Sequence, residues 1–205
     1  MLTQRKAEAA GWLIEQEWYR MESVFVCGKE YRITKLLGHG KGGYSYLAET
    51  EDGQAVVKQI HHEPCDYYTF GNKIEAEKRD YELLRHAGIR IPALIAIDED
   101  TEIVVKEYIA GNTVFDLVRD GGPADLYLDQ VREMAAQAKK AGLNIDYFPT
   151  NFVIRDGLIW YVDYECNDYM EKWNFENWGI RYWSRTPEFL EYLKRYAERA
   201  DGEEA

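Results

Sequence analysis

The sequence predicts an α+β protein in two lobes: residues 1–108 form an antiparallel β-sheet lobe with one main helix, and residues 109–205 form a compact, mainly α-helical lobe. Short apolar or alternating runs, separated by glycine-containing turns, dominate before residue 108 and are typical of strands. After residue 108, apolar residues recur mainly at helical spacing. A hydrophobic content of 46% in 205 residues is enough to bury a substantial core.

The elements of the first lobe follow from local patterns. An amphipathic helix is expected over residues 1–20, and Asp52-Gly53 is a strong hairpin signal. Strands are expected at residues 24–27, 31–37, 44–48, 55–60, 94–97 and 102–105. Residues 38–43 are expected to form a flexible glycine loop between the second and third strands. A loop at 61–72 then precedes a helix at 74–85.

The second lobe is expected to contain helices at residues 113–119 and 126–141, the latter ended by Gly142 as a C-cap. Residues 173–199 are rich in aromatic side chains and are expected to be helical in their latter part. Packing of the final helices, rather than an aromatic recognition surface, is the expected role of three evenly spaced tryptophans: Trp173, Trp178 and Trp183.

Three oxygen-bearing side chains surround a predicted hairpin in this lobe. The hairpin consists of two apolar runs and a turn: residues 152–154, 158–162 and 155–157. Asp146 and Asn151 precede it and Asp163 follows it, so that all three are expected at one end of the hairpin. Carboxylate and amide oxygens suit Mg²⁺ and the proton of a hydroxyl group. This segment is therefore the first candidate for an active site.

The glycine loop has the spacing Gly38-x-Gly40-x-x-Gly43. A dinucleotide-binding loop leads from a strand into a helix, whereas this one is followed by the strand-like residues 44–48. A glycine loop between two strands is typical of a loop that folds over phosphates, because missing side chains permit close backbone approach. A merely flexible hairpin is the alternative.

Lys58 is expected to lie on a buried face. Its neighbours in the strand alternation, Val56 and Ile60, are both apolar, so Lys58 shares their face. A lysine ammonium in a cleft between lobes needs a negative partner. The following helix supplies Glu77, and Glu75 is the alternative.

The order of these motifs resembles the protein-kinase-like fold. The resemblance covers residues 31–165 and extends through a Lys-Glu-Tyr hinge at 106–108 to Asp163-Tyr-Glu165. The last tripeptide is similar to the ending found in aminoglycoside and choline phosphotransferases and in small RIO-like kinases. The resemblance therefore favours a small, atypical Ser/Thr kinase of the RIO-like or aminoglycoside-phosphotransferase-like branch.

The resemblance implies ATP and Mg²⁺ as ligands and gives each motif a role. Lys58, braced by Glu77, would contact the α- and β-phosphates, and Asp146 would accept or orient the hydroxyl proton of the acceptor. Asn151 and Asp163 would hold Mg²⁺. The remaining nucleotide-binding positions would be three loop glycines and one hinge residue: Gly38, Gly40, Gly43 and Glu107.

Two departures from the family pattern leave alternatives open. Asn144 stands where a histidine is usual, and Phe148 replaces the lysine or histidine expected two residues after Asp146. The main expectation is transfer of the ATP γ-phosphate to a Ser/Thr hydroxyl of a protein, because only about forty residues follow Asp163 to build a small-molecule pocket. A small-molecule kinase (aminoglycoside, choline or sugar type) and a nucleotide-binding pseudokinase are the alternatives.

Composition excludes other classes of function. A net charge of −12 argues against broad binding of nucleic acids or anionic membranes, and no segment is long enough to span a bilayer. Three scattered cysteines form neither a disulfide framework nor a CxxC pair, which favours a soluble, cytoplasmic protein. His61-His62-x-x-Cys65 lacks a second ligand pair at zinc spacing and is expected to be a polar loop.

Overall fold

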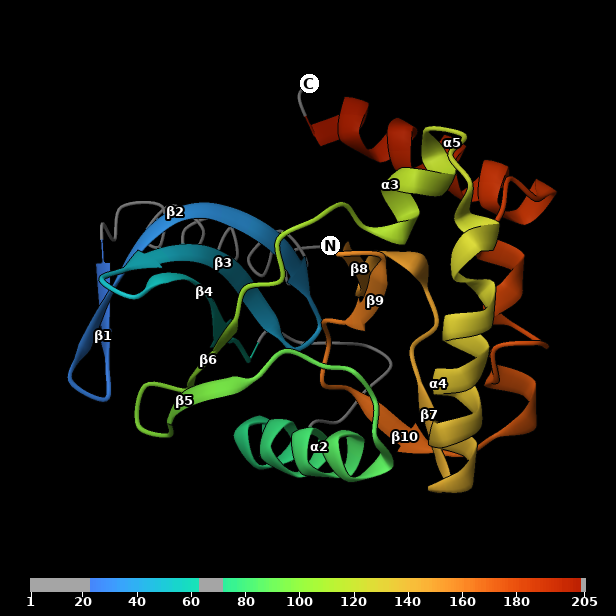
Figure 1. Ribbon diagram of the computed structural model, residues 1–205. Helices are drawn as coiled ribbons and strands as arrows, with labels where there is room; N and C mark the ends of the chain where they lie inside the picture. Colours follow the sequence, from blue (N-terminus) through green and yellow to red (C-terminus); the bar gives the residue numbers. More distant parts are fainter. Residues whose placement is uncertain (1–22, 63–71, 204–205) are drawn as a thin grey trace, which may run out of the picture. The chain divides into compact units, whose positions relative to one another are not determined.

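The computed structural model describes residues 23–62 and 72–203 and has a mixed α+β fold (Figure 1). The chain divides into two compact units. Unit 1 contains the described residues up to Lys78 together with Ala93–Tyr108, and unit 2 contains Arg79–Pro92 and the described residues from Ile109 onward. The helix expected at 1–20 and most of the loop expected at 61–72 lie outside the described residues.

Unit 1 is built on a curled, six-stranded antiparallel sheet with the strand order β1-β2-β3-β4-β6-β5 (Figure 1). Consecutive strands are hydrogen-bonded neighbours except where β6 lies between β4 and β5. The strands are β1 (Ser23–Val26), β2 (Lys29–Gly40), β3 (Gly43–Thr50), β4 (Gly53–Ile60), β5 (Leu94–Asp98) and β6 (Ile103–Glu107).

The glycine segment is more regular than the sequence predicted. The expected flexible loop at 38–43 is wrong in its extent, because β2 continues through Gly40 and β3 begins at Gly43. Only Lys41 and Gly42 remain as a tight turn between the two strands. The backbone of Gly43 lies so close to β4 that a Cβ atom there would overlap the carbonyl oxygen of Gln59. A side chain at this position would therefore separate β3 from β4.

Both faces of the sheet in unit 1 carry buried apolar side chains. One face forms a core of eight side chains from five strands: Val24, Val26, Tyr31, Ala48, Ala55, Val57, Ile103 and Val105. On the other face, Ile60 and Val104 pack with Ile74 from the first turn of α2 (Lys73–Ala87). Asn72 precedes this helix, and its side-chain oxygen accepts a hydrogen bond from the backbone N–H of Glu75 at 3.1 Å, as an N-cap does.

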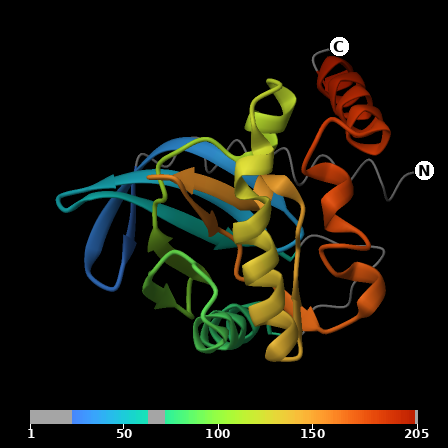
Figure 2. The same ribbon diagram turned by 45° about the vertical axis from the view of Figure 1, so that its right-hand side comes forward.

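Unit 2 combines helices with two short antiparallel ladders. Its elements after residue 109 are α3 (Val114–Arg119), α4 (Leu128–Lys140), β7 (Leu143–Ile145), β8 (Phe152–Arg155), β9 (Leu158–Tyr161), β10 (Cys166–Asp168) and α5 (Pro187–Glu203), with short 3₁₀ segments between them. β7 pairs with β10, and β8 pairs with β9. Figure 2 shows α4, in yellow, running beside β7. The sequence did not predict the β7–β10 ladder.

Local sequence explains the ends of these elements. Thr113, expected inside a helix, is instead the N-cap of α3 and forms a reciprocal capping box with Asp116. The second expected helix begins two residues late, at Leu128, because a 3₁₀ turn precedes it. The predicted hairpin is β8–β9, whose turn residues Asp156 and Gly157 both have positive φ angles, +53° and +74°.

The described residues contain no helix that is both long enough and apolar enough to cross a membrane.

Gly43→Ala is expected to lower the free energy of unfolding by about 1–3 kcal/mol, because the new methyl group would push β3 away from β4. Gly38→Ala is the matched control: its Cβ would meet nothing within 4 Å, so an effect within about 0.5 kcal/mol is expected. Urea denaturation of both variants measures the difference, and equal losses would contradict this account of Gly43.

Candidate active site

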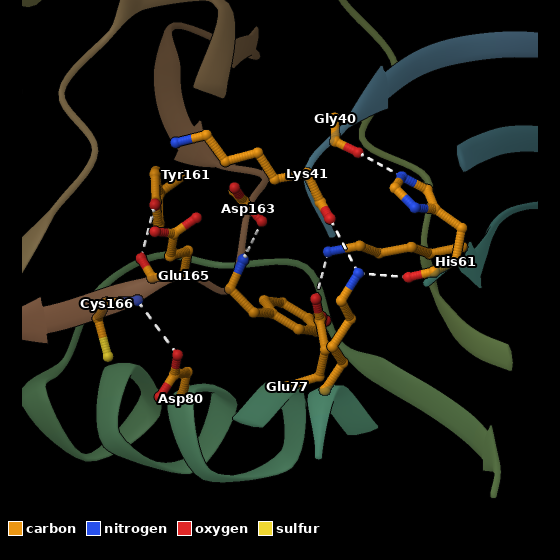
Figure 3. Close-up of polar contacts among 12 residues, drawn as sticks. Gly40, Lys41, His61, Glu77, Asp80, Tyr161, Asp163, Glu165 and Cys166 are labelled. Carbon is orange, nitrogen blue, oxygen red and sulfur yellow. Dashed lines mark hydrogen bonds and ion pairs between the residues drawn. The ribbon is translucent and has the colours of Figure 1, made fainter. Parts of the chain in front are cut away.

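Unit 1 contains a buried ion pair between Lys58 and Glu77. Lys58 lies in the middle of β4, opposite Ser45 of β3 and Val104 of β6, and only 8% of the residue is exposed. Its ammonium donates a hydrogen bond to Glu77 Oε1 (Figure 3). A buried ammonium is unfavourable without a counter-charge, and α2 supplies that charge from its second turn.

The alternative partner, Glu75, takes no part in this pair. Its side chain is 61% exposed and lies 3.3 Å from the ammonium of Lys78. In contrast, the second carboxylate oxygen of Glu77 is buried and has no hydrogen-bond partner among the described residues. Glu77 therefore retains the capacity to accept one more hydrogen bond inside unit 1.

The turn between β2 and β3 approaches this ion pair. A Cβ atom added to Gly42 would lie 3.2 Å from Lys58 Nζ and 4.0 Å from Glu77 Oε1. The sequence pattern had singled out the three other glycines and missed Gly42, although two successive glycines were a visible signal. A backbone that comes this close to an ammonium can contact the same anion that the ammonium binds.

The other predicted nucleotide-binding positions lie along the same sheet. Gly38 pairs with Ser45, and Gly40 pairs with Gly43 at the end of the hairpin. Neither Gly38 nor Gly40 has an atom within 4 Å of its missing Cβ, so neither is required to be glycine by the chain itself. Glu107 ends β6, and its carboxylate accepts a hydrogen bond from Ala93 N at 3.2 Å.

In unit 2, the β8–β9 hairpin brings Asp146, Asn151 and Asp163 to its open end. Asn151 directly precedes β8, and its carbonyl accepts a hydrogen bond from Val162 N at 2.9 Å, beside Asp163. The Asn151 side-chain amide donates to the carbonyl of Asp146 at 3.4 Å. Asp163 Oδ1 accepts from Tyr164 N at 2.8 Å (Figure 3). Asp146 and Asn151 are thus in direct contact, and Asp163 directly follows Val162, which is bonded to Asn151.

Tyr161 connects the loop at Asp146 to the segment after Asp163, and its role was not predictable because it lies in a continuous apolar run. Its hydroxyl is fully buried, donates to the carbonyl of Glu165 at 2.8 Å and accepts from Asp146 N at 3.3 Å. Burial, with Asp163 and Asp146 nearby, raises the pKa of Tyr161 well above its usual value. The hydroxyl therefore stays protonated and keeps both contacts. Figure 3 shows its bond to Glu165.

The segment after Asp163 is held by the second half of α2 and the residues that follow it. The Tyr164 hydroxyl donates to the carbonyl of Pro92 at 2.8 Å, and its ring lies 5.1 Å from that of Tyr81. Asp80 accepts from the backbone N–H of Cys166 at 3.4 Å (Figure 3). Burial, together with Asp80, raises the pKa of the Cys166 thiol to about 12, so this thiol is uncharged.

The two departures from the family pattern have structural roles in unit 2. Asn144 is 5% exposed and donates to the carbonyl of Met170 at 3.0 Å. Phe148 packs in an aromatic group, with ring centroids 4.7 Å from Tyr192 and 5.1 Å from Tyr182. Phe148 is therefore a packing residue where the pattern has a cation.

The tryptophans of the final segment divide between packing and exposure. Trp183 is 1% exposed, and its indole N–H donates to the carbonyl of Tyr147 at 2.8 Å, as the packing expectation required. Trp178 is partly buried and contacts Phe148 and Tyr182. Trp173 is 44% exposed.

The residues of unit 2 fit Mg²⁺ that arrives with a phosphate ligand. No group of three or more His, Cys, Asp or Glu side chains in the described parts of the chain could form an all-protein metal site. Mg²⁺, however, is commonly bound by one or two protein oxygens together with substrate phosphates. Asn151 and Asp163 carry side-chain oxygens of the type that such a site uses. In the His61-His62-x-x-Cys65 motif, which was expected to be a polar loop, His61 contacts Gly40, His62 pairs with Glu102, and Cys65 lies outside the described residues.

Similarity to a known protein supports a protein-kinase-like superfamily for this chain, without identifying a branch. The chain is 26% identical over 145 residues to the KEOPS complex subunit Bud32 of Pyrococcus abyssi (strain GE5 / Orsay). The matched region covers 63% of this chain and 66% of that protein. No protein-family model matches the chain.

Glu77→Gln is expected to lower the free energy of unfolding by about 3 kcal/mol, because it leaves the buried Lys58 ammonium without its counter-charge. Glu75→Gln removes the same charge from an exposed side chain two residues earlier in the same helix, and an effect within about 0.5 kcal/mol is expected. Chemical denaturation compares the two variants. Equal losses would contradict the importance of the ion pair.

Tyr161→Phe is expected to lower the free energy of unfolding by about 1 kcal/mol and to speed hydrogen exchange at the Asp146 amide, which loses its acceptor. Tyr164→Phe is the matched control, since it also removes a buried hydroxyl that donates to a carbonyl. Exchange at Asp146 should stay unchanged in the control. Equal exchange in both variants would show that Tyr161 does not hold this loop.

Proposed function

We propose that this protein is an ATP-dependent phosphotransferase that transfers the γ-phosphate of ATP to a hydroxyl group, with a serine or threonine side chain of a protein as acceptor. The observation that carries the proposal is the buried Lys58–Glu77 pair beneath a glycine turn. A protein gains little stability from burying a charge in this way. A fixed ammonium next to backbone that carries no side chain, by contrast, suits a polyphosphate.

In unit 1, Lys58 would bind the α- and β-phosphates. Glu77 holds the Lys58 ammonium in one position, so that no side-chain reorganisation is needed when a phosphate binds. The backbone of the glycine turn would cover the phosphates, because Gly42 leaves room for them next to the ammonium. Glu107, at the end of β6, would bind the nucleotide through the hinge segment.

In unit 2, Asp146 would act as the base. Its side chain is exposed, so a hydroxyl group can reach it, and the loop is held by Tyr161 and by the bond from Phe148 N to Asp146 Oδ1 at 3.0 Å. The hydroxyl proton passes to the Asp146 carboxylate while the new O–P bond forms and the bond to the departing ADP oxygen breaks. Asn151 and Asp163 would hold Mg²⁺, which when bound supplies positive charge beside the phosphates.

A protein acceptor is the favoured substrate class. Several large aromatic side chains after Asp163, namely Phe175, Trp183 and Phe189, are buried in unit 2. The similar protein of Pyrococcus abyssi is named as a subunit of a complex, which supports a protein partner for this chain as well. We further propose a cytoplasmic location, because its described cysteines, Cys27 and Cys166, are both free thiols.

Nucleotide binding without transfer is the second candidate, and Phe148 favours it. In the family pattern the residue two after the catalytic Asp is basic and supports the transferring phosphate, whereas the Phe148 ring is packed among aromatic rings. The two candidates differ in one measurement: both bind ATP with Mg²⁺, and only the first labels an acceptor.

Asp163→Ala is expected to reduce phosphate transfer by on the order of 100-fold or more, because one of the two proposed metal-holding oxygen donors is lost. Asp168→Ala, an exposed carboxylate on β10 in the same segment, is the matched control and should retain activity. Transfer of labelled γ-phosphate to the protein itself, to a mixed peptide substrate and to hydroxyl metabolites measures the effect and identifies the acceptor class.

Calorimetric titration with ATP, with and without Mg²⁺, completes the test, and thermal melting confirms that both variants fold. Unchanged transfer in Asp163→Ala would contradict the proposed function. Mg²⁺-dependent ATP binding by the wild-type protein without transfer to any acceptor would establish the second candidate instead.

A further inference from the structure

The glycine turn is anchored by a buried lysine that the kinase-like pattern does not include. Lys73, the first residue of α2, is only 5% exposed. Its ammonium donates to the carbonyl of Lys41, inside the turn, at 3.0 Å and also to the carbonyl of His61, just after β4 (Figure 3). One buried charge thus joins the turn, the end of β4 and the start of α2.

A second side chain holds the adjacent carbonyl of the same turn. His61 Nε2 lies 2.8 Å from the carbonyl oxygen of Gly40, and because a carbonyl can only accept, this nitrogen carries the proton (Figure 3). The His61 ring also lies 5.3 Å from the ring of Tyr44 in β3, and His39 stacks on Tyr44 at 4.2 Å. The two consecutive carbonyls of Gly40 and Lys41 are therefore both occupied by side chains from outside the hairpin.

The position of Lys73 on α2 links the turn to the ion pair. Lys73 is four residues before Glu77, so the two side chains project from the same face of one helix, one turn apart. Glu77 fixes Lys58, and Lys73 fixes the carbonyl next to Gly42, whose backbone approaches the same ammonium. Helix α2 therefore sets the distance between the glycine turn, which Lys73 holds, and the Lys58 ammonium, which Glu77 holds.

We propose that Lys73, assisted by His61, is a positioning residue that fixes the glycine turn over the Lys58–Glu77 pair and so prepares the turn for a nucleotide polyphosphate. This proposal rests on the proposed function. A glycine-rich turn is flexible by itself, and its ordering would otherwise be a cost of each binding event. Hydrogen bonds from a buried ammonium and a buried imidazole place that cost in folding instead, which strengthens binding.

The hydrogen bonds by which Lys73 and His61 hold the glycine turn are called the clamp below. Hydrogen exchange of the nucleotide-free protein tests the clamp independently of activity. Lys73→Met removes the ammonium and keeps the length of the side chain, and His61→Phe keeps a ring and loses the bond to Gly40. Each variant should speed exchange of the backbone amides in residues 38–46 by about tenfold, while β5 and α4 stay unchanged. Lys73→Arg should restore most of the protection.

Lys35→Met, an exposed lysine on β2 of the same hairpin, is the matched control and should leave exchange unchanged. If Lys73→Met exchanges like the wild-type protein in residues 38–46, the clamp does not exist. If Lys73→Met fails to fold, His61→Phe and Lys73→Arg provide the same comparison with smaller changes.

Nucleotide binding then separates a positioning role from a purely structural one. Lys73→Met should raise the Kd for ATP with Mg²⁺, and KM for ATP where transfer is measured, by about tenfold, with kcat changed much less. Lys73→Arg should recover most of the affinity, and Lys35→Met should bind as the wild-type protein does. Unchanged or tighter binding in Lys73→Met, together with faster exchange in the turn, would overturn the proposal, because the clamp would then be irrelevant or inhibitory.

Failure of the proposed function has a different signature. A wild-type protein that binds no ATP would contradict the function, whereas the exchange experiment would still report whether Lys73 and His61 hold the turn.

Discussion

A lysine ammonium buried in the middle of a sheet is the constraint around which unit 1 is organised. Lys58 cannot remain there charged without an anion, so α2 must place Glu77 against β4. The turn between β2 and β3 must also approach without side chains, which two adjacent glycines allow for different reasons: Gly43 for contact with β4 and Gly42 for contact with the ammonium. The packing of Ile74 on the sheet holds the helix that satisfies these demands.

In unit 2, the reversal of the chain at the β8–β9 hairpin is the organising feature. The β8–β9 hairpin returns the chain so that Asn151 and Val162 are hydrogen-bonded neighbours, which places Asp163 beside residues far earlier in sequence. Tyr161 then fixes these neighbouring segments, because its protonated, fully buried hydroxyl bonds both the loop at Asp146 and the segment at Glu165. Precision of this kind matters for catalysis, since small displacements of a base or a ligand are costly in rate.

The sequence predicted those features that leave a local signature. Alternation and turn residues located the strands and the hairpin, and the apolar neighbours of Lys58 indicated its burial; the ion pair with Glu77 is present, while its catalytic role stays a prediction. A three-residue ladder such as β7–β10 has no detectable period, and β2 extends through glycines only because β3 pairs with it. Tyr161 and Lys73 were missed because long-range hydrogen bonds, not residue type, give them their roles.

Phe148 has a consequence for how this protein could change over evolution. Its ring contacts four others: Phe115, Trp178, Tyr182 and Tyr192. A single substitution by lysine would place a charge among these rings and leave a gap in their packing. A basic residue can therefore be accommodated at this position only together with replacements among the neighbouring aromatic residues.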